Sequence, residues 1–181
     1  MDVEVRAKHI KLLILDVDGV LTDGHIIFGR EGELMKNFHS QDGLGITAAH
    51  KAGLKTAIIT GRESQIVHLR SCELKIMNVY QGSMNKVEAL TALLEKYNLK
   101  LEEVAYVGDD LIDLPVMVQV GLSCAVANAV EEVKKHAHLV TNQRGGQGAV
   151  REVVEYILKS QDKWDDIVNA YLQGGRIETK Q

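Results

Sequence analysis

The chain of 181 residues contains little cysteine, little proline and few aromatic side chains, and each shortage narrows what it can be. Its two cysteines, Cys72 and Cys124, are isolated, which argues against a disulfide framework and fits a reducing cytosol. No apolar run approaches the roughly 20 residues that a membrane-spanning helix requires. The charged residues 1–9 lack the apolar core of a secretory signal. We therefore expect a cytoplasmic protein that does not enter a membrane.

The chain also lacks an excess of basic charge. Its formal net charge is −4, and acidic and basic residues are interspersed. This pattern argues against a surface built for nucleic-acid phosphates or anionic lipids, so neither is expected as a partner. The single proline and the lack of a low-complexity linker or internal repeat predict one domain over residues 1–181.

Strand-like and helix-like segments alternate along most of the chain. This alternation predicts an α/β fold, a doubly wound parallel sheet with helices on both faces and right-handed crossovers. Two short apolar runs around a glycine-containing turn predict a β-hairpin flap at about 24–38. Strands are predicted at 10–15, 55–59, 74–80, 104–107, 122–126 and 139–141. Helices are predicted at 44–52, 85–97, 129–136, 149–158 and 162–172. The last two helices and a polar tail form a C-terminal region at about 149–181.

An acidic turn follows the first predicted strand. The run L-L-I-L leads into Asp16, Val17, Asp18 and Gly19. Because side chains alternate along a strand, Asp16 and Asp18 are expected to emerge on the same side at the carboxyl end of the sheet, where open α/β sheets bind ligands. Two carboxylates at such a short separation repel each other unless a cation or a shared proton relieves the repulsion. A simple turn is the competing interpretation, since Asp and Gly are common turn residues.

Three further groups of polar residues follow other predicted strands or begin a helix. Thr60 follows the strand at 55–59, Lys86 opens the helix at 85–97, and Asp109, Asp110 and Asp113 follow the strand at 104–107. Parallel strands end at one edge of a sheet, so these residues and the acidic turn are expected to surround one pocket.

The residue types in this pocket suit phosphoryl transfer. Several carboxylates without a His or Cys cluster favour a hard cation such as Mg²⁺. Asp16 could attack phosphorus, while Asp18 could protonate the leaving oxygen and later activate water. The Thr60 hydroxyl, backbone amides and the Lys86 ammonium could hold the phosphoryl oxygens. Asp113 could anchor Lys86 or a metal-bound water.

The segments D-V-D-G-V-L-T-D, I-I-T-G-R and V-G-D-D-L-I-D, together with the lysine between the last two, resemble the four motifs of the haloacid dehalogenase-like phosphohydrolases. The resemblance implies Asp16 as the nucleophile and Asp18 as the general acid/base. It also implies Mg²⁺ held by Asp16, the Asp18 backbone carbonyl and Asp109. The phosphoryl group would be bound by Thr60 and Lys86, with Asp110 and Asp113 as a supporting acidic shell.

The spacing between the motifs leaves no room for a cap domain, because only the hairpin and one helix fit between Asp16 and Thr60. An open site needs a second wall, which a macromolecular substrate or a neighbouring subunit could supply. The hairpin and the segments Q-D-G-L-G-I and G-G-Q-G-A-V-R-E extend the resemblance to capless family members that act on acidic sugar phosphates. That resemblance implies a homotetramer whose hairpins and C-terminal segments complete neighbouring sites.

An acidic sugar phosphate also suits the arginine that follows T-G. The Arg62 guanidinium could bind a carboxylate or phosphate, and Arg70 is a second candidate two helical turns further on. The substrate-binding residues expected are therefore Thr60, Gly61, Arg62, Arg70 and Lys86. Eight-carbon and nine-carbon (sialic-acid-type) sugar phosphates both stay open, with the pattern after T-G favouring the former.

Plainer interpretations compete with function at several positions. A receiver-like phospho-switch shares an acidic pocket on a parallel sheet, but receivers lack the second aspartate that Asp18 supplies. His136 and His138 are expected to have a capping or surface role, and the glycines at 145–148 to form a tight turn. Asp110 is expected to help cap the following helix, and Trp164 and Tyr171 to form a packing stripe.

Overall fold

A computed structural model describes residues 2–174 of the chain. In it the apolar run L-L-I-L forms β1 (Leu12–Leu15), whose four side chains are all buried. β1 lies inside a six-stranded sheet of order β5-β4-β1-β6-β7-β8. Every neighbouring pair in this sheet is parallel. The other five strands are β4 (Lys55–Ile59), β5 (Asn78–Tyr80), β6 (Val104–Gly108), β7 (Leu122–Ala125) and β8 (Leu139–Val140).

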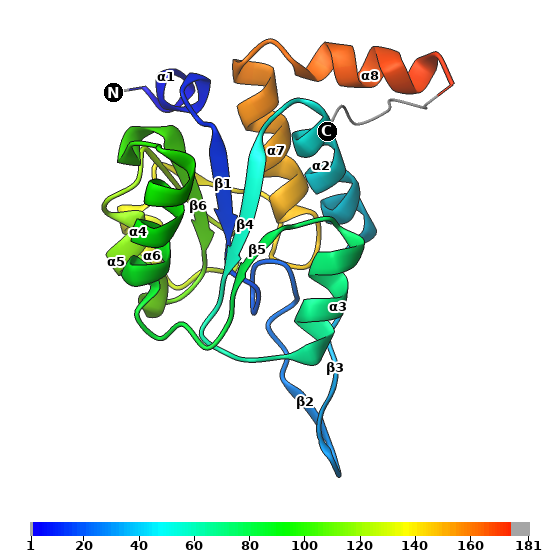
Figure 1. Cartoon of the computed structure of the whole chain (residues 1–181), viewed down its shortest axis with the longest axis vertical. Coiled ribbons are helices and arrows are strands. Elements are labelled where there is room, and N and C mark those ends of the chain that lie inside the picture. Colours follow the sequence, from blue (N-terminus) through cyan, green and yellow to red (C-terminus); the bar gives the residue numbers. More distant parts are fainter. Residues whose placement is uncertain (1, 175–181) are drawn as a thin grey trace.

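Helices cover both faces of the sheet, as Figure 1 shows. One face carries α2 (Ser40–Lys51), α3 (Gln65–Glu73) and α7 (Ala149–Ser160), and the other carries α4 (Lys86–Tyr97), α5 (Leu114–Met117) and α6 (Glu131–His136). The chain adds α1 (Val3–Lys8), α8 (Trp164–Leu172) and the short 3₁₀ helices η1 (Leu101–Glu103) and η2 (Leu111–Asp113). The predicted doubly wound α/β fold is confirmed. No helix within residues 2–174 is long and apolar enough to cross a membrane.

The predicted hairpin flap is present and projects beyond the carboxyl ends of the central strands (Figure 1). It consists of β2 (Ile27–Gly29) and β3 (Gly32–Met35), which pair antiparallel. An isolated bridge between Thr22 and Phe38 closes its base. Phe28 and Leu34 are 64% and 62% exposed, so the flap presents apolar side chains outward.

The structure differs from the sequence-based elements at α2 and at β5. α2 begins at Ser40, four residues before the predicted start, and Asp42 lies buried inside its first turn. The Asp42 carboxylate accepts hydrogen bonds from the backbone amides of Arg151 (2.8 Å) and Gly148 (3.3 Å), which ties α2 to the start of α7. The predicted strand 74–80 shrinks to β5, because the chain turns after α3 through Lys75, whose φ is 57°.

Candidate active site

Three strand ends meet at the centre of the sheet. β1 leads to Asp16, β4 to Thr60 and β6 to Asp109, and these three strands are neighbours. The chain builds β4 and β5 on one side of β1 before it returns to build β6, β7 and β8 on the other, so the strand order reverses next to β1. Such a switch point opens a crevice at the carboxyl ends of the strands, where ligands bind.

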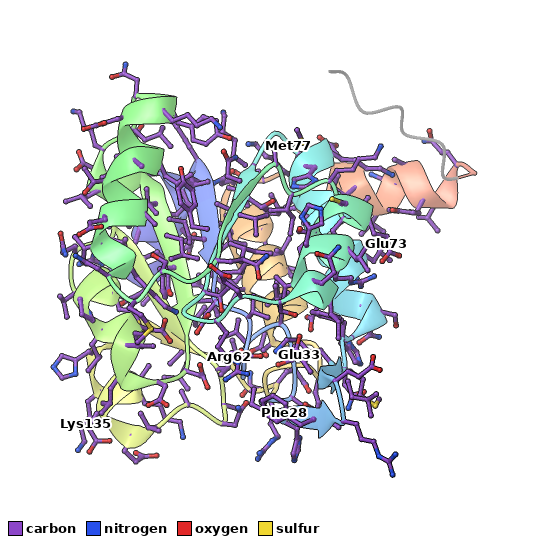
Figure 2. All side chains as sticks on the ribbon, turned by 60° about the horizontal axis from the view of Figure 1, so that its bottom comes forward. Phe28, Glu33, Arg62, Glu73, Met77 and Lys135 are labelled. Atoms are coloured by element: carbon purple, nitrogen blue, oxygen red, sulfur yellow. The ribbon has the colours of Figure 1, made fainter. Side chains whose placement is uncertain are left out.

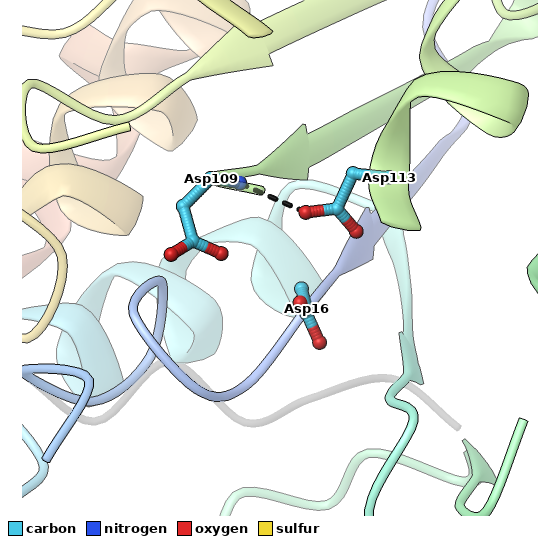
Figure 3. A group of neighbouring side chains, drawn as sticks. All are labelled: Asp16, Asp109 and Asp113. Atoms are coloured by element: carbon cyan, nitrogen blue, oxygen red, sulfur yellow. Dashed lines mark hydrogen bonds between the residues drawn. The ribbon is translucent and has the colours of Figure 1, made fainter. Parts of the chain in front are cut away.

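The crevice contains a cluster of three carboxylates, Asp16, Asp109 and Asp113 (Figure 3). One oxygen from each lies within 4.8 Å of the others. Burial and the charge of Asp113 raise the pKa of Asp16 to about 6, despite the opposing effect of Lys86. Burial and the charges of Asp16 and Asp113 raise the pKa of Asp109 to about 8. The cluster therefore carries negative charge that the protein only partly compensates.

Lys86 supplies that partial compensation. Its Nζ lies 3.0 Å from Asp16 Oδ2 and donates to Asp113 Oδ1 at 2.7 Å. Burial would lower the pKa of Lys86, but the two carboxylates outweigh it and raise this pKa. Lys86 Nζ also donates to the Tyr106 hydroxyl (3.1 Å), which in turn donates to Asp113 Oδ1 (2.6 Å). Of the two roles left open for Asp113, the contact with Lys86 is present in the structure. Tyr106, unrecognised in the sequence, completes the network.

Asp113 holds the loop after β6 as well. Its Oδ2 accepts from the backbone amides of Asp109 (2.9 Å, dashed in Figure 3) and Asp110 (3.2 Å). Asp113 therefore does not cap α5 with its side chain. Asp110 does cap, because its carboxylate accepts from the Leu111 amide at 2.7 Å, as expected.

The acidic turn requires glycine at position 19. Its φ is 87°, and a Cβ there would overlap the Asp109 carboxylate. The glycine-rich turn at 145–148 packs against the same loop, where the Gly146 amide donates to the Val20 carbonyl at 2.9 Å. Asn128 joins the two loops, because its Oδ1 accepts from the Gly145 amide at 2.6 Å and its Nδ2 donates to the Gly19 carbonyl at 3.4 Å. The tight-turn interpretation of this segment is confirmed, and it buttresses the acidic turn.

The donor set fits a hard divalent cation. Asp16 and Asp109 present carboxylate oxygens to the crevice, and oxygen ligands are what Mg²⁺ and similar ions prefer. The Asp113 oxygens are already used by Lys86, Tyr106 and two backbone amides, so Asp113 suits a supporting role. Burial is the main cause of the raised pKa of Asp16 and Asp109, and repulsion among the carboxylates adds to it; a bound cation would relieve that repulsion.

Asp18 lies outside this carboxylate cluster and has a partner of its own. Lys36, directly after β3, donates to Asp18 Oδ1 and also lies 2.9 Å from Glu33 Oε1. The Lys36 side chain is only 1% exposed. The sequence analysis did not single out Lys36 or Glu33, since a lysine and a glutamate in a short hairpin carry no spacing signal.

The predicted substrate residues separate into two places. Thr60 is buried at the end of β4, next to Gly61, and the Arg62 side chain is 47% exposed with its Nε 3.8 Å from Asp18 Oδ2. Figure 2 shows Arg62 with Glu33 and Phe28 where the hairpin meets the body of the protein. Arg70 lies elsewhere, on α3, where it lines an open surface hollow of about 450 Å³ and donates to Glu73 at 2.7 Å.

The structure also shows the roles of residues for which the sequence predicted only a capping, surface or packing function. His138 is a structural side chain, because its Nδ1 accepts from the Ser123 amide at 3.0 Å. Trp164 and Tyr171 line an apolar groove between α2, α7 and α8, which agrees with a packing stripe. Residues 175–181 of the predicted polar tail lie outside the described part of the chain.

Comparison with known proteins agrees with this geometry. A family model for haloacid dehalogenase-like hydrolases matches residues 59–153. The chain belongs to this family, and its enzyme class is that of the phosphoric monoester hydrolases.

Within the family, the chain closely resembles the 3-deoxy-D-manno-octulosonate 8-phosphate phosphatase KdsC of Escherichia coli (strain B / BL21-DE3). The two are 51% identical over 165 residues, which cover 91% of this chain and 88% of that relative. The structure of the 3-deoxy-D-manno-octulosonate 8-phosphate phosphatase from Moraxella catarrhalis, in complex with magnesium, phosphate and KDO, superimposes with a TM-score of 0.91 at 43% identity, covering 93% of this chain and 97% of that one. The cobalt-bound enzyme from Haemophilus influenzae gives a TM-score of 0.89 at 38% identity, covering 92% and 99%.

Proposed function

We propose that this protein is a single-domain, Mg²⁺-dependent phosphatase that hydrolyses 3-deoxy-D-manno-octulosonate (KDO) 8-phosphate to KDO and phosphate in the cytoplasm, during lipopolysaccharide precursor synthesis. The observation that carries the chemistry is the position of Asp16 at the switch point, 3.0 Å from the Lys86 ammonium and next to Asp109. The substrate assignment is supported by the relatives, whose names specify this sugar phosphate.

In the proposed reaction, an Asp16 carboxylate oxygen attacks phosphorus and the ester P–O bond breaks. The electron pair passes to the sugar oxygen, which takes a proton from the Asp18 carboxyl group. A water molecule then gives a proton back to Asp18 and attacks the aspartyl-phosphate, which releases phosphate and restores Asp16. Lys86, Thr60 and the amide of Gly61 are assigned to the phosphoryl oxygens.

The metal is assigned to Asp16, Asp109 and the backbone carbonyl of Asp18. When bound, Mg²⁺ would neutralise charge on the transferring phosphoryl group and on the carboxylates. Asp110 and Asp113 are assigned to the supporting shell; Asp113 keeps Lys86 and the loop after β6 in place through its four hydrogen bonds.

Arg62 and Arg70 are the residues proposed to recognise the acidic sugar. Arg62 is the better supported of the two, because its side chain is exposed beside Asp18. Arg70 faces Glu73 and the ring of Phe38 instead, with its guanidinium carbon 5.6 Å from the ring centre. A role for Arg70 in this protein would therefore require a substrate or a neighbouring subunit that reaches α3.

We also infer that the chain forms a homotetramer in which neighbouring subunits complete each site. The support is the flap itself, since Phe28 and Leu34 are largely exposed on a projecting hairpin. Light scattering on the purified protein tests this assembly. A monomer at the enzyme's working concentration would contradict it.

The function is tested by phosphate release with Mg²⁺ and with a chelator, on KDO 8-phosphate, a sialic-acid-type 9-phosphate and p-nitrophenyl phosphate. We expect metal-dependent turnover with a strong preference for KDO 8-phosphate, and no turnover by Asp16→Asn. An equal rate on the nine-carbon sugar would move the assignment to that substrate. No release from any ester by the folded protein would contradict the phosphatase itself and favour a receiver-like switch.

A further inference from the structure

Two buried lysines each join a pair of carboxylates beside the crevice. Lys86 lies between Asp16 and Asp113, as described above. Lys36 lies in the same way between Asp18 and Glu33, and both lysine side chains are 1% exposed. Each aspartate of the D-x-D turn therefore has its own buried ammonium group, one from the body of the protein and one from the flap.

The Lys36 ammonium is itself held from a second element. Glu33, on β3, accepts a hydrogen bond from the Ser64 hydroxyl, and Ser64 caps α3 by accepting from the Val67 amide at 3.3 Å. Burial would raise the pKa of Glu33, but the hydrogen bonds from Ser64 and Lys36 outweigh it and lower this pKa, which favours the ionised carboxylate. The chain of contacts from Asp18 through Lys36 and Glu33 to Ser64 connects the reactive turn, the flap and α3.

A buried ammonium is costly to maintain unless its partners compensate it. Lys36 is too buried to reach a substrate, so its influence must pass through the side chains that it contacts. Of these, Asp18 lies beside the crevice, whereas Glu33 faces Ser64. The exposed Arg62 is a second cation near Asp18, with its Nε 3.8 Å from Oδ2. Without Lys36, the Asp18 carboxylate would be free to turn toward Arg62 or solvent.

We propose that Lys36 is a positioning residue for hydrolysis, which holds the Asp18 carboxyl group in place and stabilises the negative charge that forms on it as it protonates the leaving sugar oxygen. This inference rests on the proposed role of Asp18 as general acid. In that step the ester P–O bond breaks, the Asp18 proton moves to the sugar oxygen, and the carboxylate left behind faces the Lys36 ammonium. A fixed charge aimed at a group that becomes charged in the transition state accelerates the step.

The leaving group provides a readout that a merely structural role would not change. A sugar alkoxide is a poor leaving group and needs the proton from Asp18, whereas p-nitrophenolate leaves without one. In the full-length, Mg²⁺-loaded enzyme, Lys36→Met should lower kcat/KM for the sugar phosphate about 10- to 100-fold, within the range of general acid catalysis. The same variant should lower kcat/KM for p-nitrophenyl phosphate by less than about threefold, since this constant reports the first transfer step.

A double-mutant cycle with Asp18→Asn makes the test sharper. If Lys36 acts through Asp18, then Lys36→Met should cost less than about threefold when Asp18 is already Asn. Lys36→Arg keeps the charge and should recover part of the sugar phosphate activity; it also covers the case in which Lys36→Met fails to fold. Lys135→Met, on α6 and far from the flap in Figure 2, is the matched control and should leave both activities unchanged.

Equal losses on the two esters, or the full loss in the Asp18→Asn background, would overturn this inference while leaving the phosphatase assignment intact. A wild-type enzyme that cleaves p-nitrophenyl phosphate but no acidic sugar phosphate would overturn only the proposed substrate, and the same comparison would then use glycerol 1-phosphate as the alkyl ester. A wild-type enzyme that cleaves neither kind of ester would overturn both.

Discussion

Asp113 gives the strongest quantitative prediction, because four hydrogen bonds converge on one fully buried carboxylate. Oδ1 accepts from Lys86 and Tyr106, and Oδ2 accepts from the amides of Asp109 and Asp110. Asparagine has almost the same shape but only one acceptor oxygen. In Asp113→Asn, two of the four donors must therefore face an NH₂ group, and the Lys86 ammonium keeps Asp16 as its remaining carboxylate partner.

Each buried donor left without an acceptor costs about 1–3 kcal/mol, and more when it is charged. Removing one charge from a buried ion pair costs about 3–5 kcal/mol as a whole. We therefore expect Asp113→Asn to lower the free energy of unfolding by about 3–5 kcal/mol. For a chain of this length each kcal/mol lowers Tm by about 2–4 °C, so Tm should fall by about 6–20 °C.

Urea unfolding of the metal-free protein, followed by circular dichroism, measures this loss. The matched control is Asp110→Asn, the same substitution three residues away. Its carboxylate caps the exposed start of η2 through the Leu111 amide, and asparagine caps almost as well, so the change should stay below about 0.5 kcal/mol. If Asp113→Asn lost less than about 1 kcal/mol, the four hydrogen bonds would not be the support described here.

Three further outcomes are expected. The pKa of Asp109 is raised to about 8, so a cation that binds this carboxylate at neutral pH must displace its proton. Calorimetric titration should therefore show the affinity for Mg²⁺ rising by up to about tenfold per pH unit between pH 6 and 8. An affinity that does not change with pH would contradict the raised pKa of Asp109. Gly19→Ala should weaken Mg²⁺ binding about 10- to 100-fold by displacing the Asp109 carboxylate. Gly32→Ala, which shares a positive φ but meets no atom, should leave Mg²⁺ binding unchanged, and equal effects of the two variants would point to backbone strain alone. Arg62→Ala should raise KM for the acidic sugar phosphate about tenfold, the loss of about one charged hydrogen bond, with little change for p-nitrophenyl phosphate; an equal rise for both would argue against carboxylate recognition.

Much of the crevice could be predicted from the order of residues along the chain. A strand of a parallel sheet delivers whatever follows it to one known edge, so Asp16 after β1, Thr60 after β4 and Asp109 after β6 were expected to meet. The hairpin was predictable from an equally local pattern, a glycine-containing turn between two short apolar runs. These predictions succeeded because each depends on a few neighbouring residues and on the direction of the strand.

The partners of these residues depend on contacts between distant segments. Tyr106 looks like any other apolar residue of a buried strand until its hydroxyl is seen between Lys86 and Asp113. Lys36 likewise lies 18 positions from Asp18 in the sequence. No periodicity in the sequence predicts that the hairpin brings Lys36 against the acidic turn.

Sequence alone thus determined which reactive groups reach the carboxyl edge of the sheet, since the direction of a strand and the residues that follow it are local properties of the chain. Only the tertiary structure decided which cation pairs with which carboxylate, and that Arg70 faces Glu73 instead of the carboxylate cluster. The physical reason is that ion pairing depends on distances of a few ångströms between separate elements. Those distances arise only when the flap, α3 and the sheet pack together.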